Sequence, residues 1–536
     1  MAYTAEEKKI LIRYFTSAEA DIFGLTDIPE AIKGTLFSRY SRTAKDLRRL
    51  FLDEFVTQKE LAQFFKNDSK KSNTSLDVAR AEDFYERILV GYGDDSVAEL
   101  GGAHVALENI SMLATKSVEE HRLGLSPLEK STRYVYFDKK VNGEYLYYRD
   151  PKIMKSKHKN AYIKACDHLF DAYTDIVRNM QPVLKKVYPG DENDTAYKFS
   201  IRAKACDIAR GLLPLSALTN MGVYGNGRAF EYLLTTLLAD PLSEVRDMAE
   251  VLNDSLRQVI PAFVKRATNE RGIKYRAYLE KTEKDLSSLV GALHAMPVRT
   301  KTSSVKLVEY DKDATEKIIA GLIYNHTNIS YFEAYKQAKA LSATKKEKYL
   351  KAMRAHRENR HHKYPRPVEE AVVAFDVVAD WGVYKDLMRH RILTRHRQLF
   401  TNELGYLLPR EIEMTGFTKT YCDAMDEAAE VYAKIKQTMP YEAQYMVTHG
   451  SYNRFYLKMN VREVGHLTEL RSTPQGHPTY RKVAQDMANE LGKKLPLIQK
   501  YLLPFVDYND YELERLSAFK KVAAKAEKMG IKAFEE

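Results

Sequence analysis

Cysteine is scarce in this chain, and long apolar runs are missing from it. Its three cysteines, Cys166, Cys206 and Cys422, lie far apart and show no Cys-x-x-Cys spacing, which argues against a disulfide framework and a thiolate zinc site. No apolar run approaches the roughly 20 residues that span a bilayer. The first residues, Met-Ala-Tyr-Thr-Ala-Glu-Glu-Lys-Lys, lack the apolar core of a signal peptide. We therefore expect a reduced, cytoplasmic protein without a membrane anchor.

The bulk composition is that of a folded protein with a basic surplus. Its 536 residues suggest two to four domains, and 44% hydrophobic and 11% aromatic residues exclude a disordered chain. The formal net charge is +11 and the isoelectric point is near 9.0. Such a charge favours anionic partners, which could be nucleotides, phosphorylated cofactors or nucleic acid. Charge alone does not choose among them.

The stretch from Glu119 to Tyr134 concentrates polar side chains of several kinds. Apolar residues before it recur at spacings of three and four and predict a helix, at Ala103, Leu107, Ile110, Ala114 and Val118. Gly124 and Ser126-Pro127 should end that helix. The loop would then hold six candidate ligand-binding residues: His121, Arg122, Glu129, Ser131, Arg133 and Tyr134. Two guanidiniums can bind phosphate oxygens, and a hydroxyl and a carboxylate can bind a polar ring edge. A solvated loop, with its arginines paired to Glu120 and Glu129, is the simpler interpretation.

An internal repeat runs through the chain. Five positions in one segment have matching residues 235 positions later: Arg246, Ala249, Leu256, Ile260 and Pro261 with Arg481, Ala484, Leu491, Leu495 and Pro496. Asn226-x-Arg228 matches Asn460-x-Arg462 at a separation of 234 positions, and His121-Arg122 matches His390-Arg391 at a separation of 269. The second His-Arg follows another apolar pattern that predicts a helix, with Val373, Val377, Trp381, Tyr384 and Met388. Three blocks in the same order favour a duplication over chance.

The remaining segments complete the predicted organisation. We expect a mostly helical start, with a helix opening at Pro29 and a polar loop at Lys66–Ser75. A hairpin should turn at Val141-Asn142-Gly143. Helices should follow from about Ala161 to Lys265, broken by a glycine-rich turn at Gly222–Gly227. The alternation in Ser303–Tyr310 predicts a strand. The predicted boundaries are 1–84 for a helical extension, 85–265 and 303–508 for the two copies, 266–302 for a connector and 509–536 for a helical tail. The predicted class is α/β, more specifically an α-rich α+β fold.

A basic, histidine-rich segment, Arg354–Arg366, predicts an exposed loop. His356, His361 and His362 could ligate a metal, but they have no carboxylate or thiolate partner at ligand spacing, so we predict no metal site. The segment could also be a nucleic-acid patch, although a solvated basic surface is the commoner case, so nucleic-acid binding is not expected.

The first loop resembles a known signature. His121-Arg122, eight intervening residues and Ser131-Thr132-Arg133-Tyr134, with Glu129 two residues before the serine, are similar to the motif of flavin-dependent thymidylate synthases. That motif begins Arg-His-Arg, and Glu120 replaces its first arginine here. Ser96-Val97-Ala98-Glu99 resembles a further, degraded segment of the family. The resemblance implies two copies of a thymidylate synthase complementing protein-like fold, with small sheets and long helices, related by a pseudo-two-fold axis.

The second copy keeps what the first lacks. It has the full triplet Arg389-His390-Arg391, but Leu399 stands within a sequence that lacks the serine loop. Family members carry a nucleotide-binding arginine eleven residues after the asparagine of Asn-x-Arg. Arg471 fits that spacing in the second copy, whereas Leu237 occupies it in the first. Arg471 could alternatively form only an ion pair with Glu469. Arg210, before Pro214, matches another nucleotide-binding arginine of the family, and Lys436 is its counterpart in the second copy.

The resemblance implies a shared site and a reaction. Ser131, Arg133 and Arg471 would stand at the reacting nucleotide, and the substrate-binding residues would be Glu129, Ser131, Arg133, Tyr134, Arg210 and Arg471. The cofactor-binding residues would be His121, Arg122, Arg389, His390, Arg391, Asn460, Arg462 and His477. The expected cofactor is FAD, the co-substrates are methylenetetrahydrofolate and NADPH, and the product comes from methylation of dUMP or a similar nucleotide.

Two other classes of function stay open at this point. One is a degenerate relative that binds flavin or nucleotide without synthase activity, as Glu120, Leu237 and Leu399 would suggest. The other is a helical nucleic-acid binder that uses the basic surface. Because the family forms tetramers of single copies, we expect this fused chain to form a homodimer, a pseudo-tetramer.

Overall fold

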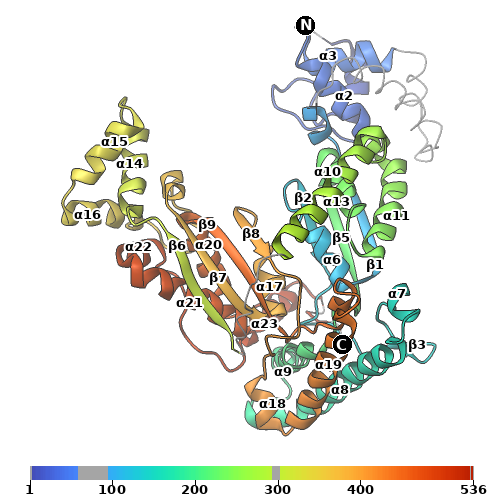
Figure 1. The fold of residues 1–536 in the computed structure, drawn as a ribbon. Helices are drawn as coiled ribbons and strands as arrows, with labels where there is room; N and C mark the ends of the chain where they lie inside the picture. The colour runs from blue at the N-terminus through green and yellow to red at the C-terminus, as the bar shows by residue number, and fades with distance from the viewer. Residues whose placement is uncertain (1–2, 58–94, 292–301, 532, 535–536) are drawn as a thin grey trace. The chain divides into compact units, whose positions relative to one another are not determined.

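The computed structural model describes residues 3–57, 95–291, 302–531 and 533–534 (Figure 1). These form two compact units. Unit 1 comprises residues up to 110, 114–129 and 219–296, and unit 2 comprises 111–113, 130–218 and 297–536. The predicted loop at Lys66–Ser75, the beginning of the first copy at residue 85 and the end of the connector lie outside the described residues.

A three-stranded sheet in the order β1-β5-β2 forms the centre of unit 1. It is built from β1 (Gly102–Ser111), β2 (Leu125–Glu129) and β5 (Leu218–Asn226). The prediction of one helix through residues 103–118 was therefore wrong, because β1 comes first and only α6 (Met112–Glu119) is helical. Asn109 has a positive φ of 56° inside β1, and such an irregularity shifts apolar positions away from strict alternation, so that they mimic a helical spacing.

The glycines at 222 and 225 lie within β5, so the predicted glycine-rich turn was also wrong. A side chain at Gly225 would collide with Leu125 of β2 and the ring of Phe230. Glycine here permits close approach within the sheet and does not mark a turn. The following helix, α10 (Gly227–Leu237), packs with α11 (Ser243–Val259), α12 (Pro261–Val264) and α13 (Glu270–Gly291) in the same unit.

The N-terminal helices of unit 1 have a core of their own. They are α1 (Ala5–Tyr14), α2 (Glu30–Tyr40) and α3 (Leu47–Phe51), followed by a π-helical turn at Leu52–Val56. Pro29 is the N-cap of α2, as predicted. Leu11, Leu36, Phe51 and Phe55 are completely buried in this core.

Unit 2 contains a four-stranded sheet in the order β6-β7-β9-β8. Its strands are β6 (Ser304–Tyr310), β7 (Val372–Asp380), β8 (Leu393–Arg397) and β9 (Tyr452–Asn460), and all neighbours are antiparallel. The predicted strand at Ser303–Tyr310 is confirmed by β6. The predicted helix from Val373 to Met388 was wrong in its first half, which is β7, and right only in α17 (Trp381–Leu387). Most of β7 is buried on both faces, and such a continuous apolar run does not distinguish a strand from a helix.

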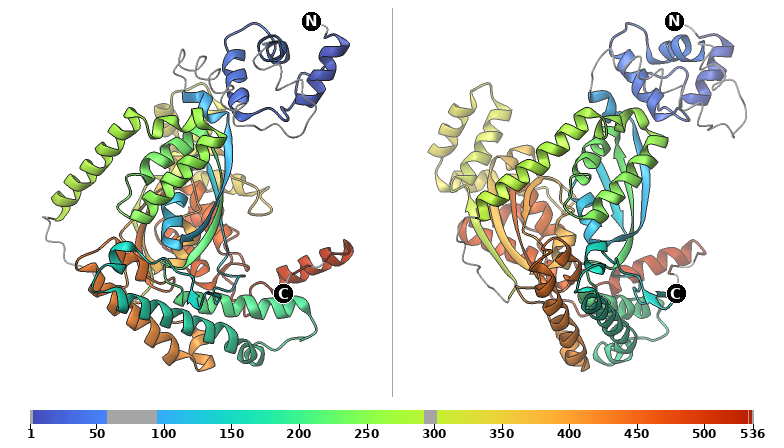
Figure 2. Two further views of the ribbon diagram at one scale, coloured as in Figure 1. Left: turned by 90° about the vertical axis from the view of Figure 1, so that its right-hand side faces the viewer. Right: turned by 45° about the vertical axis from the view of Figure 1, so that its right-hand side comes forward.

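Helices cover this sheet and form two further groups within unit 2. Two helices, α20 (Val461–Arg471) and α21 (Pro478–Lys494), contact the sheet. The next helix in the sequence, α22 (Pro496–Leu502), packs against α21. A small helical group consists of α14 (Ala314–His326), α15 (Tyr331–Ala340) and α16 (Ala343–Arg354). A second group, side by side in both views of Figure 2, consists of α8 (Lys159–Val187), α9 (Thr195–Ala209) and α19 (Thr418–Lys436). The shorter elements of unit 2 are α7 (Pro151–Met154), α18 (Arg410–Thr415), α23 (Leu516–Lys528) and a hairpin of β3 (Lys140–Val141) and β4 (Glu144–Tyr145).

That hairpin turns where the sequence predicted. Asn142 and Gly143 both have positive φ, of 53° and 82° respectively, as a tight two-residue hairpin turn requires. Its strands are shorter than expected and do not reach Tyr136-Phe137.

The same order of elements occurs in both units and confirms the predicted fold of two copies. In each, a strand leads into a short helix, and a second strand follows. Later in the chain comes a third strand, directly followed by a helix whose N-cap is an asparagine. The central three strands have the order β1-β5-β2 in unit 1 and β7-β9-β8 in unit 2. The matching pairs are β1/β7, α6/α17, β2/β8, β5/β9, α10/α20, α11/α21 and α12/α22.

The compact units do not follow the boundaries of the sequence copies. Residues 130–218 of the first copy, which include α8 and α9, belong to unit 2. There the segment after α9 pairs through its backbone with the segment after α19. The Leu215 amide donates to the Val447 carbonyl at 2.7 Å, and the His449 amide donates to the Leu213 carbonyl at 3.0 Å. Backbone hydrogen bonds therefore join the helical half of one copy to the other copy.

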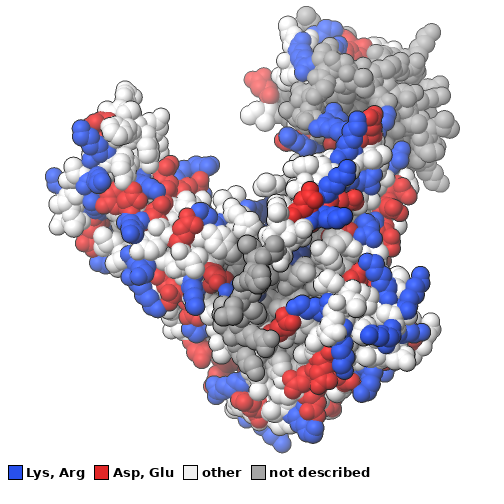
Figure 3. All heavy atoms as spheres, in the orientation of Figure 1, with Lys and Arg blue, Asp and Glu red and all other residues white. Residues whose placement is uncertain are grey.

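Two observations describe the membrane-crossing potential of the helices and the charge on one face. No helix in the described ranges is long and apolar enough to cross a membrane. Acidic and basic side chains are interspersed over the described atoms of the face in Figure 3. The basic segment Arg354–Arg366 is largely exposed, as predicted, but Arg357 is buried and pairs with Glu469.

The repeated asparagines give a test of the helix starts. Asn226 and Asn460 each cap a helix, accepting from the backbone amides of Ala229 and Glu463 at 2.8 Å. Replacing either with alanine should lower the free energy of unfolding by about 1 kcal/mol, because one amide of the first turn loses its partner. Urea unfolding of Asn226→Ala and Asn460→Ala measures this effect. Asn→Asp variants, which keep the cap, are the matched controls, and alanine variants with wild-type stability would contradict the interpretation.

Candidate functional site

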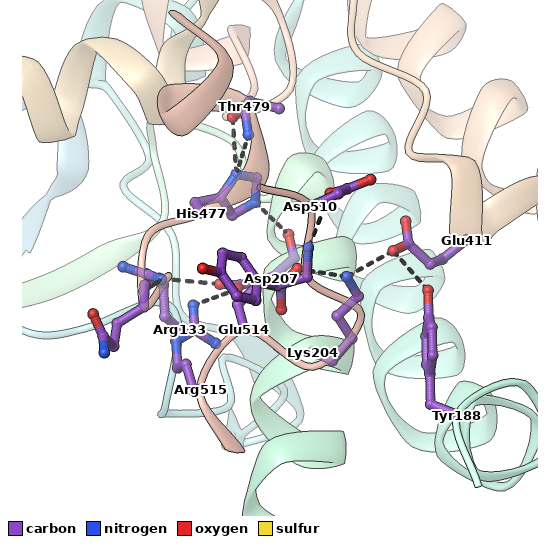
Figure 4. A network of polar contacts seen from close by, with 12 residues as sticks. Arg133, Tyr188, Lys204, Asp207, Glu411, His477, Thr479, Asp510, Glu514 and Arg515 are labelled. Atoms are coloured by element: carbon purple, nitrogen blue, oxygen red, sulfur yellow. Dashed lines mark hydrogen bonds and ion pairs between the residues drawn. The ribbon is translucent and has the colours of Figure 1, made fainter. Parts of the chain in front are cut away.

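Arg133 is held in unit 2 by a carboxylate on α9. Its Nε donates to Asp207 Oδ1 at 3.1 Å, and its Nη2 donates to the Gln475 carbonyl at 2.9 Å (Figure 4). The amide of Arg133 donates to Ser131 Oγ at 3.2 Å, which tightens the turn between the two residues. Only 15% of the Arg133 side chain is exposed. The guanidinium is therefore fixed before any ligand binds.

Tyr480, the third residue of α21, contacts an arginine from each of the two copies. The Cζ atoms of Arg133 and Arg471 are 5.8 Å and 5.7 Å from the centre of its ring. Arg133 also donates to the Tyr480 hydroxyl at 3.4 Å. Arg133 and Arg471 therefore contact the same tyrosine, as residues of one site would. The alternative of an Arg471–Glu469 ion pair is not what the structure has, because Glu469 pairs with Arg357 at 2.7 Å.

A second buried carboxylate, Asp386 of α17, stands among four arginines. Burial would raise the pKa of Asp386, but the surrounding guanidiniums outweigh burial and lower this pKa to about 2; they are Arg133, Arg210, Arg389 and Arg471. Asp207 is buried too, and its pKa lies well below its usual range because Arg515, Arg133, His477 and Arg210 outweigh burial. Both carboxylates are ionised at neutral pH and offset part of the positive charge of the arginines.

The cluster still carries an excess of positive charge. Five guanidiniums, those of Arg133, Arg210, Arg389, Arg471 and Arg515, surround three carboxylates, those of Asp207, Asp380 and Asp386. Burial raises the pKa of Asp380 to about 6 despite Arg210, so this carboxylate is the weakest counter-charge of the three. The Nη2 of Arg210 is buried and has no hydrogen-bond partner among the described residues. Surplus guanidinium charge and an unsatisfied buried donor favour an anionic ligand.

His390 does not point outward from the Arg-His-Arg triplet. Its Nδ1 lies 2.6 Å from Glu463 Oε1, and its Nε2 accepts a hydrogen bond from Arg471 Nε at 3.1 Å. His390 is therefore the tautomer that is protonated on Nδ1, and it links Glu463 to Arg471. The buried side chain thereby orients Arg471, and its contact with a cofactor stays a prediction.

His466 completes a possible metal-ligand cluster with His390 and Glu463, and their ligand atoms lie within 4.8 Å of one another. Two cationic groups already occupy the surroundings. Lys363 Nζ lies 2.7 Å from His466 Nδ1, and Arg471 contacts His390. Positive charges so close to the ligand atoms oppose binding of a metal cation. The arrangement therefore suits a hydrogen-bonded ion cluster.

The other predicted cofactor residues of the second copy differ in what they contact. Arg389 and Arg391 are exposed beyond the end of α17. Asn460 caps α20, and Arg462 donates to the Tyr364 carbonyl at 2.7 Å. The Nε2 of the buried His477 donates to the Asp207 carbonyl at 3.3 Å. Arg389 and Arg391 are therefore the two best placed to meet a ligand from solvent.

The predicted residues that lie in unit 1 form a separate buried network. Lys116 pairs with both Glu119 and Glu129, the latter at 3.0 Å, and Arg122 lies 3.9 Å from Glu119. His121 lies 2.7 Å from the Ser117 carbonyl and 2.8 Å from Thr236 Oγ1. Leu237, the counterpart of Arg471, is buried in the core. Ion pairs and core packing thus engage these side chains within unit 1.

Several residues of the arginine cluster were not identified from the sequence. Asp207, Asp386, Glu463 and Tyr480 have no repeated spacing or motif in the two copies that marks them. Asp386 could have been suspected, because it lies one turn before Arg389 and a carboxylate at that spacing on a helix can pair with it. Tyr134, by contrast, was predicted to bind substrate. It is 47% exposed and packs against Arg515, whose Cζ is 5.4 Å from its ring centre.

Comparison with known proteins adds independent findings. A sequence profile of the family described as "Thymidylate synthase complementing protein" matches residues 45–262 and again 306–497. A protein of Chlamydia pneumoniae called "UPF0159 protein" is 41% identical over 96% of this chain and 97% of its own length. A "UPF0159 protein" of Thermoplasma acidophilum is 33% identical over 91% of this chain and 97% of its own.

A smaller relative matches only part of the chain. The "Flavin-dependent thymidylate synthase" of Clostridium tetani is 24% identical over 236 residues, which cover 89% of that protein and 38% of this chain. A single-copy relative of a duplicated chain would give such coverage.

Glu463 and His466 should give opposite pH dependences of stability. Burial raises the pKa of Glu463 to about 7, and burial lowers the pKa of His466 to about 4. The contribution of Glu463 to stability is present below its unfolded pKa of about 4.5 and is lost as the pH rises through about 7. The contribution of His466 is present above about 6.5 and is lost as the pH falls toward 4. The two effects oppose each other between pH 5 and 6.5.

We therefore expect Glu463→Gln to become less stable as the pH falls from 6.5 to 5, by on the order of 1 kcal/mol per pH unit, while His466→Asn becomes more stable. Thermal unfolding at the two pH values measures this, with the wild type as the reference. Two variants with the same slope as the wild type would contradict the assignment.

Proposed function

Because the chain belongs to the thymidylate synthase complementing protein family, we propose that it catalyses the FAD-dependent reductive methylation of dUMP or a closely related pyrimidine nucleotide. Methylenetetrahydrofolate would supply the carbon unit, and NADPH would be the reductant. The observation that carries the proposal is the convergence of Arg133 and Arg471, one from each copy, on Tyr480 beside a cluster with surplus positive charge. An anionic nucleotide is the kind of substrate that such a cluster attracts.

The proposed roles follow from what each side chain already contacts. Arg133 and Arg471 are oriented by Asp207 and by His390, so they can present fixed donors to a phosphate without reorganisation. Arg210, with its unpaired buried Nη2, would gain a partner when an anion binds. Ser131 would anchor the nucleotide beside Arg133 and would not act as a nucleophile. Tyr480 offers an aromatic face between the two arginines.

The residues around α17 fit a flavin dinucleotide in part. Arg389 and Arg391 follow the end of this helix, are exposed, and would hold the diphosphate. Bound FAD would supply the hydride-transfer chemistry that the protein side chains lack. We assign cofactor binding mainly to Arg389 and Arg391 because both are exposed, whereas His390 is buried.

A second candidate function is a flavin- and nucleotide-binding protein without synthase activity. The inward position of His390 favours it, because a family cofactor contact would then be missing. Turnover of dUMP with methylenetetrahydrofolate and NADPH separates the two candidates. For either, we propose a homodimer, to be measured by light scattering.

The nucleotide site can be tested by titration with dUMP. A hydrogen bond to a charged group contributes roughly 1.5–3 kcal/mol, so Arg133→Ala and Arg471→Ala should each weaken dUMP binding about tenfold to a hundredfold. The double variant should lose less than the sum of the two, because both arginines serve one ligand. Calorimetry gives the affinities, and Leu237→Met at the counterpart position is the control. Wild-type affinity in Arg471→Ala would refute the shared site.

The flavin assignment has a visible readout. Wild-type protein should take up FAD and show flavin absorbance, whereas the double variant Arg389→Ala with Arg391→Ala should bind it at least tenfold more weakly, because both diphosphate contacts are lost. Arg228→Ala is the control, since this exposed arginine pairs with Glu99 in unit 1. A wild-type protein that does not bind FAD on titration would remove the flavin assignment.

A further inference from the structure

The chain beyond the family match returns to the arginine cluster. The matched region ends at residue 497. After α22 the backbone runs back along α21 and is fastened there. The Asp507 amide donates to Ser472 Oγ at 2.9 Å, and Arg481 Nη2 donates to the Asn509 carbonyl at 2.8 Å. These hydrogen bonds fix the path of the chain that leads to Glu514 and Arg515.

Two consecutive residues of this segment are buried against α9. Lys204 Nζ lies 2.7 Å from Glu514 Oε1, and Arg515 Nη2 donates to Asp207 Oδ2 (Figure 4). Lys204 and Asp207 are neighbours on one face of α9, since they are three positions apart. Glu411 holds Lys204 from another direction at 2.8 Å. The acidic Glu514 thus pairs with the basic Lys204, and the basic Arg515 pairs with the acidic Asp207.

Asp207 is shared between Arg515 and Arg133. Oδ1 accepts from Arg133 Nε, and Oδ2 accepts from Arg515 Nη2. If Arg133 were the only partner of Asp207, the carboxylate and the guanidinium would form an ion pair without net charge. With Arg515 on the other oxygen, two positive charges share one negative charge, so Arg133 keeps charge with which to attract an anion.

We propose that Arg515 is a positioning residue for nucleotide binding, which acts on Arg133 through Asp207, and that the segment 507–515 is therefore part of the substrate site. The inference rests on the proposed function, because it names the phosphate of the nucleotide as the ligand of Arg133. It extends the site to a segment beyond the family match, and it gives a functional reason for two buried ion pairs at its end.

The test compares dUMP with deoxyuridine, which lacks the phosphate. Arg515→Met should weaken dUMP binding about tenfold and leave deoxyuridine binding within about twofold of wild type. A general loss of structure would weaken both. Arg515→Lys, which keeps the charge near Asp207, should bind dUMP within about threefold of wild type. If Arg515→Met does not fold, Arg515→Gln replaces it with the same expected result.

The chain offers a matched control and a double-mutant cycle. Lys520 also connects the C-terminal region to α9, 3.7 Å from Asp194, but is largely exposed, and Lys520→Met should leave dUMP binding unchanged. In an Arg133→Met background, Arg515→Met should cost less than twofold, because its effect passes through Arg133.

The outcomes distinguish this inference from the proposed function. If Arg133→Met weakens dUMP binding and Arg515→Met does not, the role of Arg515 is refuted and the nucleotide site stands. An equal loss for dUMP and deoxyuridine in Arg515→Met would also refute it. If the wild type does not prefer dUMP to deoxyuridine, the proposed nucleotide site fails, and the inference fails with it.

Discussion

Two buried carboxylates, Asp207 and Asp386, make the arginine cluster of unit 2 possible. Guanidiniums placed so closely would repel one another and would lose hydration, so they can be buried only around ionised counter-charges. The low pKa values of both aspartates have the same cause, because the nearby guanidiniums stabilise the ionised carboxylates more than burial destabilises them. The two carboxylates stabilise the buried guanidiniums, and the positive charge that they leave uncompensated favours an anionic ligand.

The two copies use corresponding positions for different purposes. In unit 1, Lys116 binds Glu119 and Glu129, and Leu237 fills the core. In unit 2, Arg471 stands where Leu237 does, supported by His390 and Glu463. A position that packs the core in one copy is thus charged and hydrogen-bonded in the other. Such divergence is possible after a duplication, since one copy can lose ligand-binding side chains while the other retains them.

The fold also explains why residues of both copies can act together. The helices α8 and α9 come from the first copy but pack in unit 2 with α19 of the second. The backbone pairing of Leu213–Leu215 with Val447–His449 fixes this association. Asp207 on α9 can therefore hold Arg133 within reach of Tyr480 and Arg471, although Arg133 and Arg471 are far apart in the sequence.

The sequence by itself determined the duplication, the order of the blocks and the residue types at the site. The repeated blocks, which occur in the same order in both copies, and the strand at Ser304–Tyr310 are local features, and local spacing is sufficient to reveal them. The strands β1 and β7 were mistaken for helices because a bulged or doubly buried strand loses its alternation.

Only the tertiary structure decided which charges meet. Spacing predicted that Arg133 and Arg471 could belong together, but not that both would contact Tyr480 or that both would lower the pKa of Asp386. It did not reveal that His390 turns inward to Glu463, or that Arg515 reaches Asp207 from the other end of the chain. The physical reason is that ion pairs and hydrogen bonds depend on distance in space and on burial, and a linear sequence specifies neither until the chain is folded.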